Sequence, residues 1–172
     1  MSSLFYIIIA ILVLQFLLET FLDFLNAKHY DDPVPEELSD VFDASKYQKS
    51  QAYKKTRYRF GLVTSTFSLL LTLGFLIFGG FEWVDQIVRN ITENPILMAL
   101  LFFGIIMIGS DIVTTPFSYY STFVIEEKFG FNKSTRTLFI MDKLKGWLMS
   151  GILGGGILAV IIWFYQWADV NF

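Results

Sequence analysis

Four long apolar segments alternate with three polar ones along the chain. The apolar segments are approximately residues 4–25, 60–81, 95–124 and 144–167. Each is long enough to cross the ~30 Å hydrocarbon layer of a bilayer as a helix, which takes roughly 18 or more residues. Backbone polar groups in a bilayer must be satisfied internally, so helices are the expected spanning form. The pattern predicts an all-α chain with four transmembrane helices, in which residues 1–172 form one multi-span membrane domain.

The first apolar segment is expected to be a retained helix. Residues 1–3 contain no Lys or Arg, and no small-x-small cleavage site follows the apolar stretch. A signal peptide usually has a basic start and a shorter apolar core.

The basic residues are distributed unevenly among the polar segments. Residues 26–59 contain seven Lys or Arg, residues 82–94 contain one, and residues 125–145 contain five. Cytoplasmic loops of membrane proteins are enriched in Lys and Arg. The distribution therefore predicts cytoplasmic loops over 26–59 and 125–143, with both termini outside. Trp83, Trp163 and Trp167 then fall at the outer ends of the spans, as expected for an interfacial aromatic belt.

Both cytoplasmic loops are predicted to contain helical extensions of the spans. Asp43 is a suitable N-cap for a helix that continues into the second span, and Ser134 or Thr135 is a suitable start for one leading into the fourth. Gly130 is expected to form a turn, with the positive φ that glycine tolerates. Pro116 is predicted to kink the third span. The extensions would form a structured rim at the inner membrane surface.

Composition narrows the possible functions. Hydrophobic residues make up 54% of the chain and charged residues 17%, against about 25% charged in average soluble domains. The net charge of −3 gives no reason to expect binding to nucleic acid. The chain has one His and no Cys, which excludes disulfides, thiolate chemistry and Cys-ligated metals. No catalytic residue, metal ligand or bound cofactor is predicted for these 172 residues.

Polar residues inside the spans are the first candidate functional groups. Gln15, Glu19 and Asp23 recur at i, i+4 and i+8, so they share one helix face. Such groups usually face a cavity or a partner, because exposure to lipid is costly. They could line a water-filled interior or form an interhelical ion pair with Arg57, Arg59 or Lys145. Asp111 lies about 24 Å along the third span from its start, and both a proton relay and a structural role remain open.

Two further patterns are less specific. Gly151 and Gly155 form a small-xxx-small pair that permits close helix packing, with a partner in the same chain or in another. The segment from His29 to Glu37 contains several acidic residues and two prolines, without the spacing of an EF-hand or zincin site. It is interpreted as a solvated acidic turn, with a hard-cation site as the alternative.

Several stretches together resemble the N-terminal membrane region of the type I CAAX prenyl endopeptidases. The carrying stretches are Val34-Pro-Glu-Glu-Leu38, Lys46-Tyr-Gln-Lys-Ser-Gln-Ala-Tyr53, Arg59-Phe-Gly-Leu62 and Pro116-Phe-Ser-Tyr-Tyr-Ser-Thr-Phe-Val-Ile-Glu-Glu-Lys-Phe-Gly-Phe-Asn-Lys133. Thr135, Phe139, Asp142, Lys145 and Gly146 continue the resemblance, which covers nearly the whole chain. The stretch in the third loop is the most distinctive.

The resemblance implies a ring of membrane helices around a water-filled chamber. It also implies an HExxH zinc site on a later helix, with exposed or prenylated peptide tails as substrates. Residues 1–172 contain no HExxH, so the chain is expected to be inactive alone, as a fragment or a naturally truncated product. The resemblance, together with the position of Asp111 inside the third span, suggests chamber or rim positions for Glu19, Asp23, Tyr47, Tyr53, Asp111, Glu126, Asn132, Asp142 and Lys145.

The expected function is therefore that of the N-terminal membrane domain of a CAAX prenyl protease-like zinc metallopeptidase. Its expected partners are the lipid bilayer, a C-terminal catalytic domain absent from this chain, and peptide tails. The expected location is a bacterial cytoplasmic membrane. The alternative is a stand-alone four-helix transporter or scaffold. For the third loop, a simple solvated hairpin is weighed against a surface that docks the zinc-bearing helices.

Overall fold

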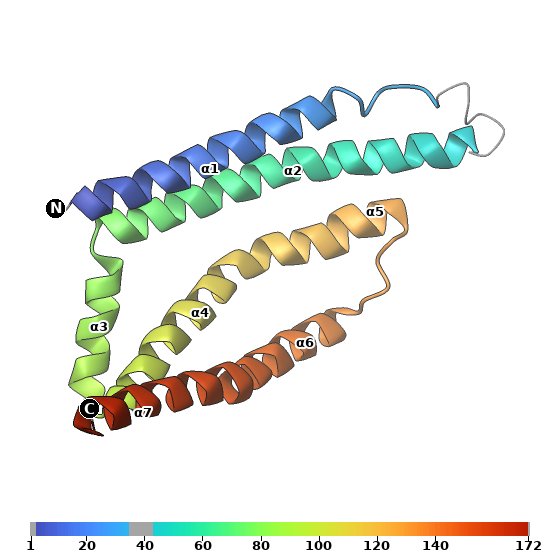
Figure 1. The fold of residues 1–172 in the computed structure, drawn as a ribbon. Helices are drawn as coiled ribbons and strands as arrows, with labels where there is room; N and C mark the ends of the chain where they lie inside the picture. The colour runs from blue at the N-terminus through green and yellow to red at the C-terminus, as the bar shows by residue number, and fades with distance from the viewer. Residues whose placement is uncertain (1–2, 35–42, 172) are drawn as a thin grey trace. The chain divides into compact units, whose positions relative to one another are not determined.

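The structure is a computed structural model that describes residues 3–34 and 43–171 (Figure 1). Its helices are α1 (Ser3–Ala27), α2 (Ala44–Ile77), α3 (Gly80–Ile91), α4 (Pro95–Tyr120), α5 (Glu127–Phe129), α6 (Arg136–Met149) and α7 (Gly155–Asn171). Two π-helical turns, Ser121–Glu126 and Ser150–Gly154, connect α4 to α5 and α6 to α7. No strand occurs in the described ranges, so the predicted all-α class is confirmed.

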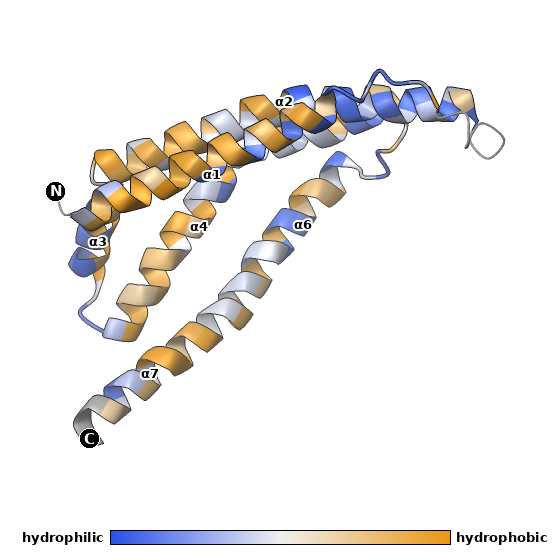
Figure 2. Ribbon diagram, turned by 45° about the horizontal axis from the view of Figure 1, so that its top comes forward, coloured by the Kyte–Doolittle hydropathy of each residue, from blue (hydrophilic) through white to orange (hydrophobic). Residues whose placement is uncertain are grey.

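The four predicted spans are confirmed as helices long and apolar enough to cross a membrane. These helical stretches are Ser3–Ala27, Ala44–Ile77, Pro95–Phe129 and Arg136–Ala168. The second and fourth begin well before their apolar parts, so the loops do contribute helical extensions. Figure 2 shows this along α2, whose N-terminal end is hydrophilic and whose C-terminal end is hydrophobic.

The prediction for the second polar loop was wrong in one respect. Residues 82–94 were expected to be a loop, but α3 occupies most of this stretch, and the second span ends at Ile77 rather than at residue 81. Gly79 separates the two helices with a φ of 72°, in the left-handed region that glycine adopts without steric cost. The sequence contains a helix here that is too short and too polar to span a membrane.

Side-chain caps fix where three of the helices begin. Asp43 Oδ1 accepts the backbone N–H of Ser45 at 2.9 Å at the start of α2, and Thr135 Oγ1 accepts that of Leu138 at 3.2 Å at the start of α6. Both N-caps were predicted from the sequence. Asn94 caps α4 in the same way, accepting the N–H of Leu97 at 3.1 Å.

The chain divides into two compact units, each built from two separate segments. One unit comprises Met1–Ile77 and Tyr119–Asn132, and the other comprises Phe78–Ser118 and Lys133–Phe172. The fully described helices α1, α2 and α4 contain no buried residue. Their apolar side chains are left for lipid or for other membrane helices, as expected of membrane spans.

Gly155 allows close packing within the second unit. A Cβ added at Gly155 would lie 3.3 Å from Leu100 Cδ2 of α4, tighter than an ordinary contact, whereas one added at Gly151 would meet nothing within 4 Å. Of the predicted small-xxx-small pair, Gly155 therefore packs against the same chain. A hollow of about 790 Å³ lined by both glycines lies beside this contact.

Candidate functional site

The first candidate site lies in the first unit, where α2 meets the turn that follows α5. Arg57 Nη1 donates a hydrogen bond to Tyr53 Oη at 3.0 Å and lies 3.5 Å from Glu126 Oε1. The Glu126 side chain is 28% exposed and that of Arg57 is 52% exposed. Arg57 thus joins two residues that the sequence had proposed separately as rim positions. We refer to Tyr53, Arg57, Glu126, Phe129 and Phe131 as the rim cluster.

The turn in the rim cluster is a Schellman motif. Gly130 has a φ of 73°, as the sequence predicted. The N–H of Phe131 donates to the carbonyl of Glu126 at 2.9 Å, and the N–H of Gly130 donates to that of Glu127 at 3.0 Å. These two bonds satisfy carbonyls at the helix end, and they require the left-handed residue between them. A β-branched residue at position 130 would therefore be strained by about 1–3 kcal/mol.

Aromatic contacts fix this turn against α2. The ring of Tyr53 meets those of Phe129 and Phe131 edge-on, with centroids 5.3 and 4.8 Å away. Phe129 is buried at 7% exposure, and Lys49 Nζ lies 5.7 Å from the centroid of the Phe131 ring. Edge-to-face pairs are each worth about 0.5–1.5 kcal/mol beyond the area they bury. The third loop is thus a packed turn and not a freely solvated connection.

The other candidates on this loop and on α6 are less constrained. Asn132 Nδ2 donates to Glu127 Oε2 at 2.7 Å, which ties the end of the turn to α5. Lys145 Nζ lies 4.0 Å from Asp142 Oδ1, with both side chains at least 60% exposed. The sequence anticipated this i, i+3 pair, and exposed pairs are typically worth no more than about 1 kcal/mol.

The second candidate site lies in the second unit, between α4 and α6. Asp111 Oδ1 accepts a hydrogen bond from Lys143 Nζ at 2.7 Å, and Asp111 Oδ2 accepts one from Trp147 Nε1 at 2.9 Å. The side chains of Asp111 and Lys143 are 32% and 21% exposed. Both carboxylate oxygens of Asp111 are therefore occupied, which favours a structural role over a proton relay.

Sequence reasoning missed both partners of Asp111. They lie 32 and 36 residues away in the sequence. Helix periodicity relates only residues a few positions apart, so it gives no indication of these contacts. One signal was available, because Lys143 and Trp147 are four residues apart and so share a helix face. Phe139, one of the residues that continue the resemblance, lies on α6, with Lys143 Nζ 5.6 Å from its ring centroid.

The polar face of the first span has no cationic partner among the described side chains of the first unit. Gln15 Nε2 donates to Glu19 Oε1 at 2.9 Å, while Asp23 is exposed. Of the ion pairs weighed above, those with Arg57 or Arg59 are not formed among the described residues of this unit, where Arg57 pairs with Glu126. Glu19 and Asp23 remain candidates for a face that borders water or another helix.

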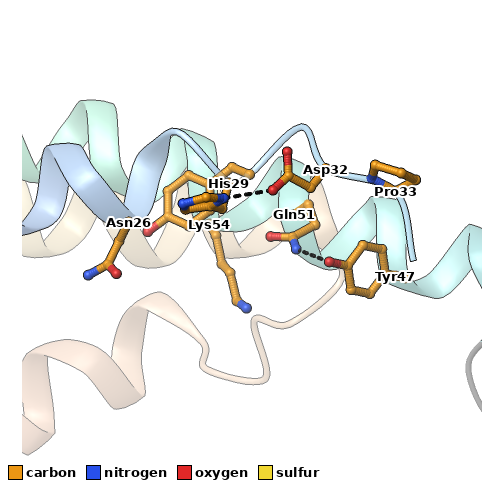
Figure 3. A pocket seen from close by; sticks show the side chains of 8 residues that line it. Asn26, His29, Asp32, Pro33, Tyr47, Gln51 and Lys54 are labelled. Atoms are coloured by element: carbon orange, nitrogen blue, oxygen red, sulfur yellow. Dashed lines mark hydrogen bonds and ion pairs between the residues drawn. The ribbon is translucent and has the colours of Figure 1, made fainter. Parts of the chain in front are cut away.

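A hollow of about 430 Å³ lies between the turn after α1 and the start of α2 (Figure 3). His29 Nδ1 and Asp32 Oδ2 are 2.7 Å apart on one side, and Gln51 Nε2 donates to Tyr47 Oη at 2.7 Å on the other. Gln51 Oε1 is buried without a hydrogen-bond partner. The hollow includes the predicted residue Tyr47, and sequence reasoning missed Gln51.

The described residues do not fit a metal site. No group of three or more His, Cys, Asp or Glu side chains within them could hold a metal ion. His29 and Asp32 alone are too few ligands for a structural or catalytic zinc ion, which takes three or four from the protein. Glu36 and Glu37, part of the acidic segment considered above, lie outside the described residues.

Comparison with known proteins identifies the family. A family model described as the CAAX prenyl protease N-terminal region, with five membrane helices, matches residues 23–172. The chain belongs to this family. The suspected resemblance is therefore confirmed, and residues 1–172 form an N-terminal membrane domain of CAAX prenyl protease type. The family description counts five membrane helices, whereas the described part of this chain contains four candidate spans.

Individual CAAX prenyl proteases align along most of the chain. The CAAX prenyl protease 1 homologues of Oryza sativa subsp. japonica and Arabidopsis thaliana are 36% and 35% identical, covering 90% and 92% of this chain. The crystal structure of S. mikatae Ste24p matches 96% of the chain with a TM-score of 0.89 and 28% identity. The chain spans about two fifths of the length of these proteins, between 38% and 40%.

The comparisons also correct the expected location. A multi-pass integral membrane protein is supported, but the matching CAAX prenyl proteases come from plants, a slime mould, yeasts and animals. These eukaryotic sources do not support the bacterial cytoplasmic membrane expected from the sequence.

Proposed function

We propose that this chain forms part of the chamber wall of a zinc metallopeptidase that cleaves C-terminal peptide tails, including prenylated ones. In this proposal the rim cluster borders the opening through which the tail enters. Zinc and its ligands would belong to the portion of the CAAX prenyl proteases that this chain does not cover. The family match favours this function over a stand-alone transporter or scaffold.

The observation that carries the proposal is the number of contacts that meet in the rim cluster. An ion pair, a phenol hydrogen bond, two aromatic contacts and a Schellman turn all converge on the end of one membrane helix. A surface connection does not require so many constraints. Catalysis by a separate zinc site does, because small displacements of a bound substrate sharply reduce the rate.

The remaining candidates have supporting roles in this proposal. Glu19 and Asp23 would line the chamber from the first span, and Tyr47 would extend the polar surface of the rim. Asp142, Lys145 and Asn132 would contact the zinc-bearing helices. The side chains of Asp142 and Lys145 are exposed, which supports such contacts.

The test replaces the residue that joins the rim cluster. Arg57→Gln removes both the bond to Tyr53 and the attraction to Glu126, while Arg89→Gln serves as the matched control, since Arg89 pairs with Asp85 on α3. In the complete protein reconstituted in bilayers, we expect Arg57→Gln to lower kcat/KM for a tail peptide about tenfold, equivalent to about 1.4 kcal/mol of lost positioning. Arg89→Gln should have little effect.

Zinc content and thermal stability are measured in parallel for both variants. A fall in kcat/KM with unchanged zinc content supports a role in positioning the substrate. Equal activity of Arg57→Gln and Arg89→Gln would show that the rim cluster does not border the substrate's path.

A further inference from the structure

The surface of helix α3 consists of three strips of residues. Val84 and Val88, four residues apart, are buried at 2% and 1% exposure. In the same unit, the ring of Phe81 lies 6.3 Å from that of Phe102 on α4, measured between centroids. This strip therefore packs against the protein and explains why so short a helix is stable.

A second apolar strip lies beside the first, and the residues at its two ends are exposed. Trp83, Ile87 and Ile91 follow one another at four-residue intervals, so they share one face of α3. Trp83 is 62% exposed and Ile91 is 63% exposed. Large apolar side chains gathered on one helix face are unfavourable in water and point to a partner.

The third strip is polar and lies opposite the two apolar ones. Glu82, Asp85 and Arg89 belong to it, and Arg89 Nε donates to Asp85 Oδ2 at 2.7 Å. A helix with one apolar and one charged face is typical of segments that lie in a membrane interface.

The connections of α3 indicate which partner covers the open strip. Two residues separate it from the span that ends at Ile77, and three separate it from the span that begins at Pro95. A helix of 12 residues is about 18 Å long. The four residue steps from Ile91 to Pro95 cover at most about 14 Å. If α3 stood perpendicular to the membrane, its C-terminal end would lie about 18 Å from the surface, too far for this connection to reach the start of the next span. Both ends of α3 are therefore held near the same face of the bilayer.

We propose that α3 is an interfacial helix whose Trp83, Ile87 and Ile91 strip is inserted into the lipid headgroup and acyl-chain boundary. Tryptophan favours this boundary because its ring is amphipathic. The partner is the lipid surface itself, and the polar strip faces water. The inference does not depend on the proposed catalytic role, since it rests only on the two flanking spans crossing the membrane.

The test measures the depth of single nitroxide labels in the complete protein, reconstituted in phosphatidylcholine vesicles. Residues 1–172 contain no cysteine, so Trp83→Cys, Ile91→Cys and the control Glu82→Cys each introduce one label site here. Any cysteine elsewhere in the polypeptide is replaced beforehand. All three positions are exposed, so the labels do not open the packed strip. Collision rates are measured with oxygen, which concentrates in lipid, and with a nickel chelate, which stays in water.

We expect the oxygen-to-nickel collision ratio to be severalfold higher at positions 83 and 91 than at position 82. High nickel collision at all three positions would place the strip in water and overturn the proposal. Low collision with both reagents at 83 and 91 would show that protein covers the strip, which would overturn it equally.

Discussion

The ion pair between Asp111 and Lys143 shows how one residue can stabilise a membrane domain that buries little. A charge inside a span is costly unless it is neutralised. Here the carboxylate binds both Lys143 and the indole N–H of Trp147, so α4 and α6 are joined by two hydrogen bonds. Loss of either charge leaves the other without its partner. The resulting loss of stability is larger than that caused by removing both charges together.

A double-mutant cycle measures this contribution. Asp111→Asn should lower the free energy of unfolding by about 1–3 kcal/mol, less than the loss at a fully buried pair because both side chains are partly exposed. Lys143→Met combined with Asp111→Asn should recover part of that loss. Thermal unfolding of the complete protein in detergent gives the comparison, with Lys145→Met as the exposed control. Additive effects at Asp111 and Lys143 would show that the two charges do not interact.

At the scale of the element, the start of α2 depends on one charged cap. Asp43 Oδ1 accepts the N–H and the hydroxyl of Ser45 at 2.9 and 2.6 Å, as well as the N–H of Lys46 at 3.4 Å. These bonds, the Ser45 hydroxyl foremost, lower the pKa of Asp43 below its usual value. A carboxyl whose pKa is lowered by folding stabilises the folded form above its unfolded pKa, and this stabilisation is lost as the pH falls through its folded pKa.

Acidification below about pH 4 should therefore loosen the first turn of α2, since an ordinary Asp titrates near there. Asp43→Asn retains a good N-cap without a titratable group and should remove the pH dependence. In Asp43→Ala, the amides of this first turn should exchange quickly at every pH. Amide hydrogen exchange of residues 44–50, corrected for the intrinsic pH dependence, provides the measurement. The same acid-induced loss of protection in Asp43→Asn would rule out Asp43 as its cause.

The elements differ in how far the sequence predicted them, for identifiable reasons. The spans were predictable because an apolar run of that length has few other stable structures. The starts at Asp43 and Thr135 were predictable because capping is local. The helix α3 was missed because its apolar residues are interspersed with charges over only 12 positions. The contacts of Asp111, and the convergence of Tyr53, Arg57 and Glu126, were missed because they join residues far apart in the sequence.

For the whole molecule, the distribution of basic residues makes a prediction about topology. The 7:1:5 count of Lys and Arg in the three loops predicts that the third loop is cytoplasmic and that α3 lies on the opposite side. In sealed vesicles with the cytoplasmic face outward, an impermeant maleimide should label Lys133→Cys at once and Glu82→Cys only after detergent is added. The reverse order would invert the topology, and equal labelling in sealed vesicles would contradict the number of crossings between the two positions.

The interleaving of the two compact units has a consequence for biosynthesis. The first unit needs residues 119–132 to complete it, yet 41 residues of the second unit, Phe78–Ser118, are synthesised in between. When the first two spans leave the ribosome, the later partners of Tyr53 and Arg57, which are Glu126, Phe129 and Phe131, have not yet been translated. The helices α1 and α2 therefore lack these contacts in the membrane until the third span has been inserted. Chaperones or insertases that protect unfinished membrane helices would encounter this chain during that interval.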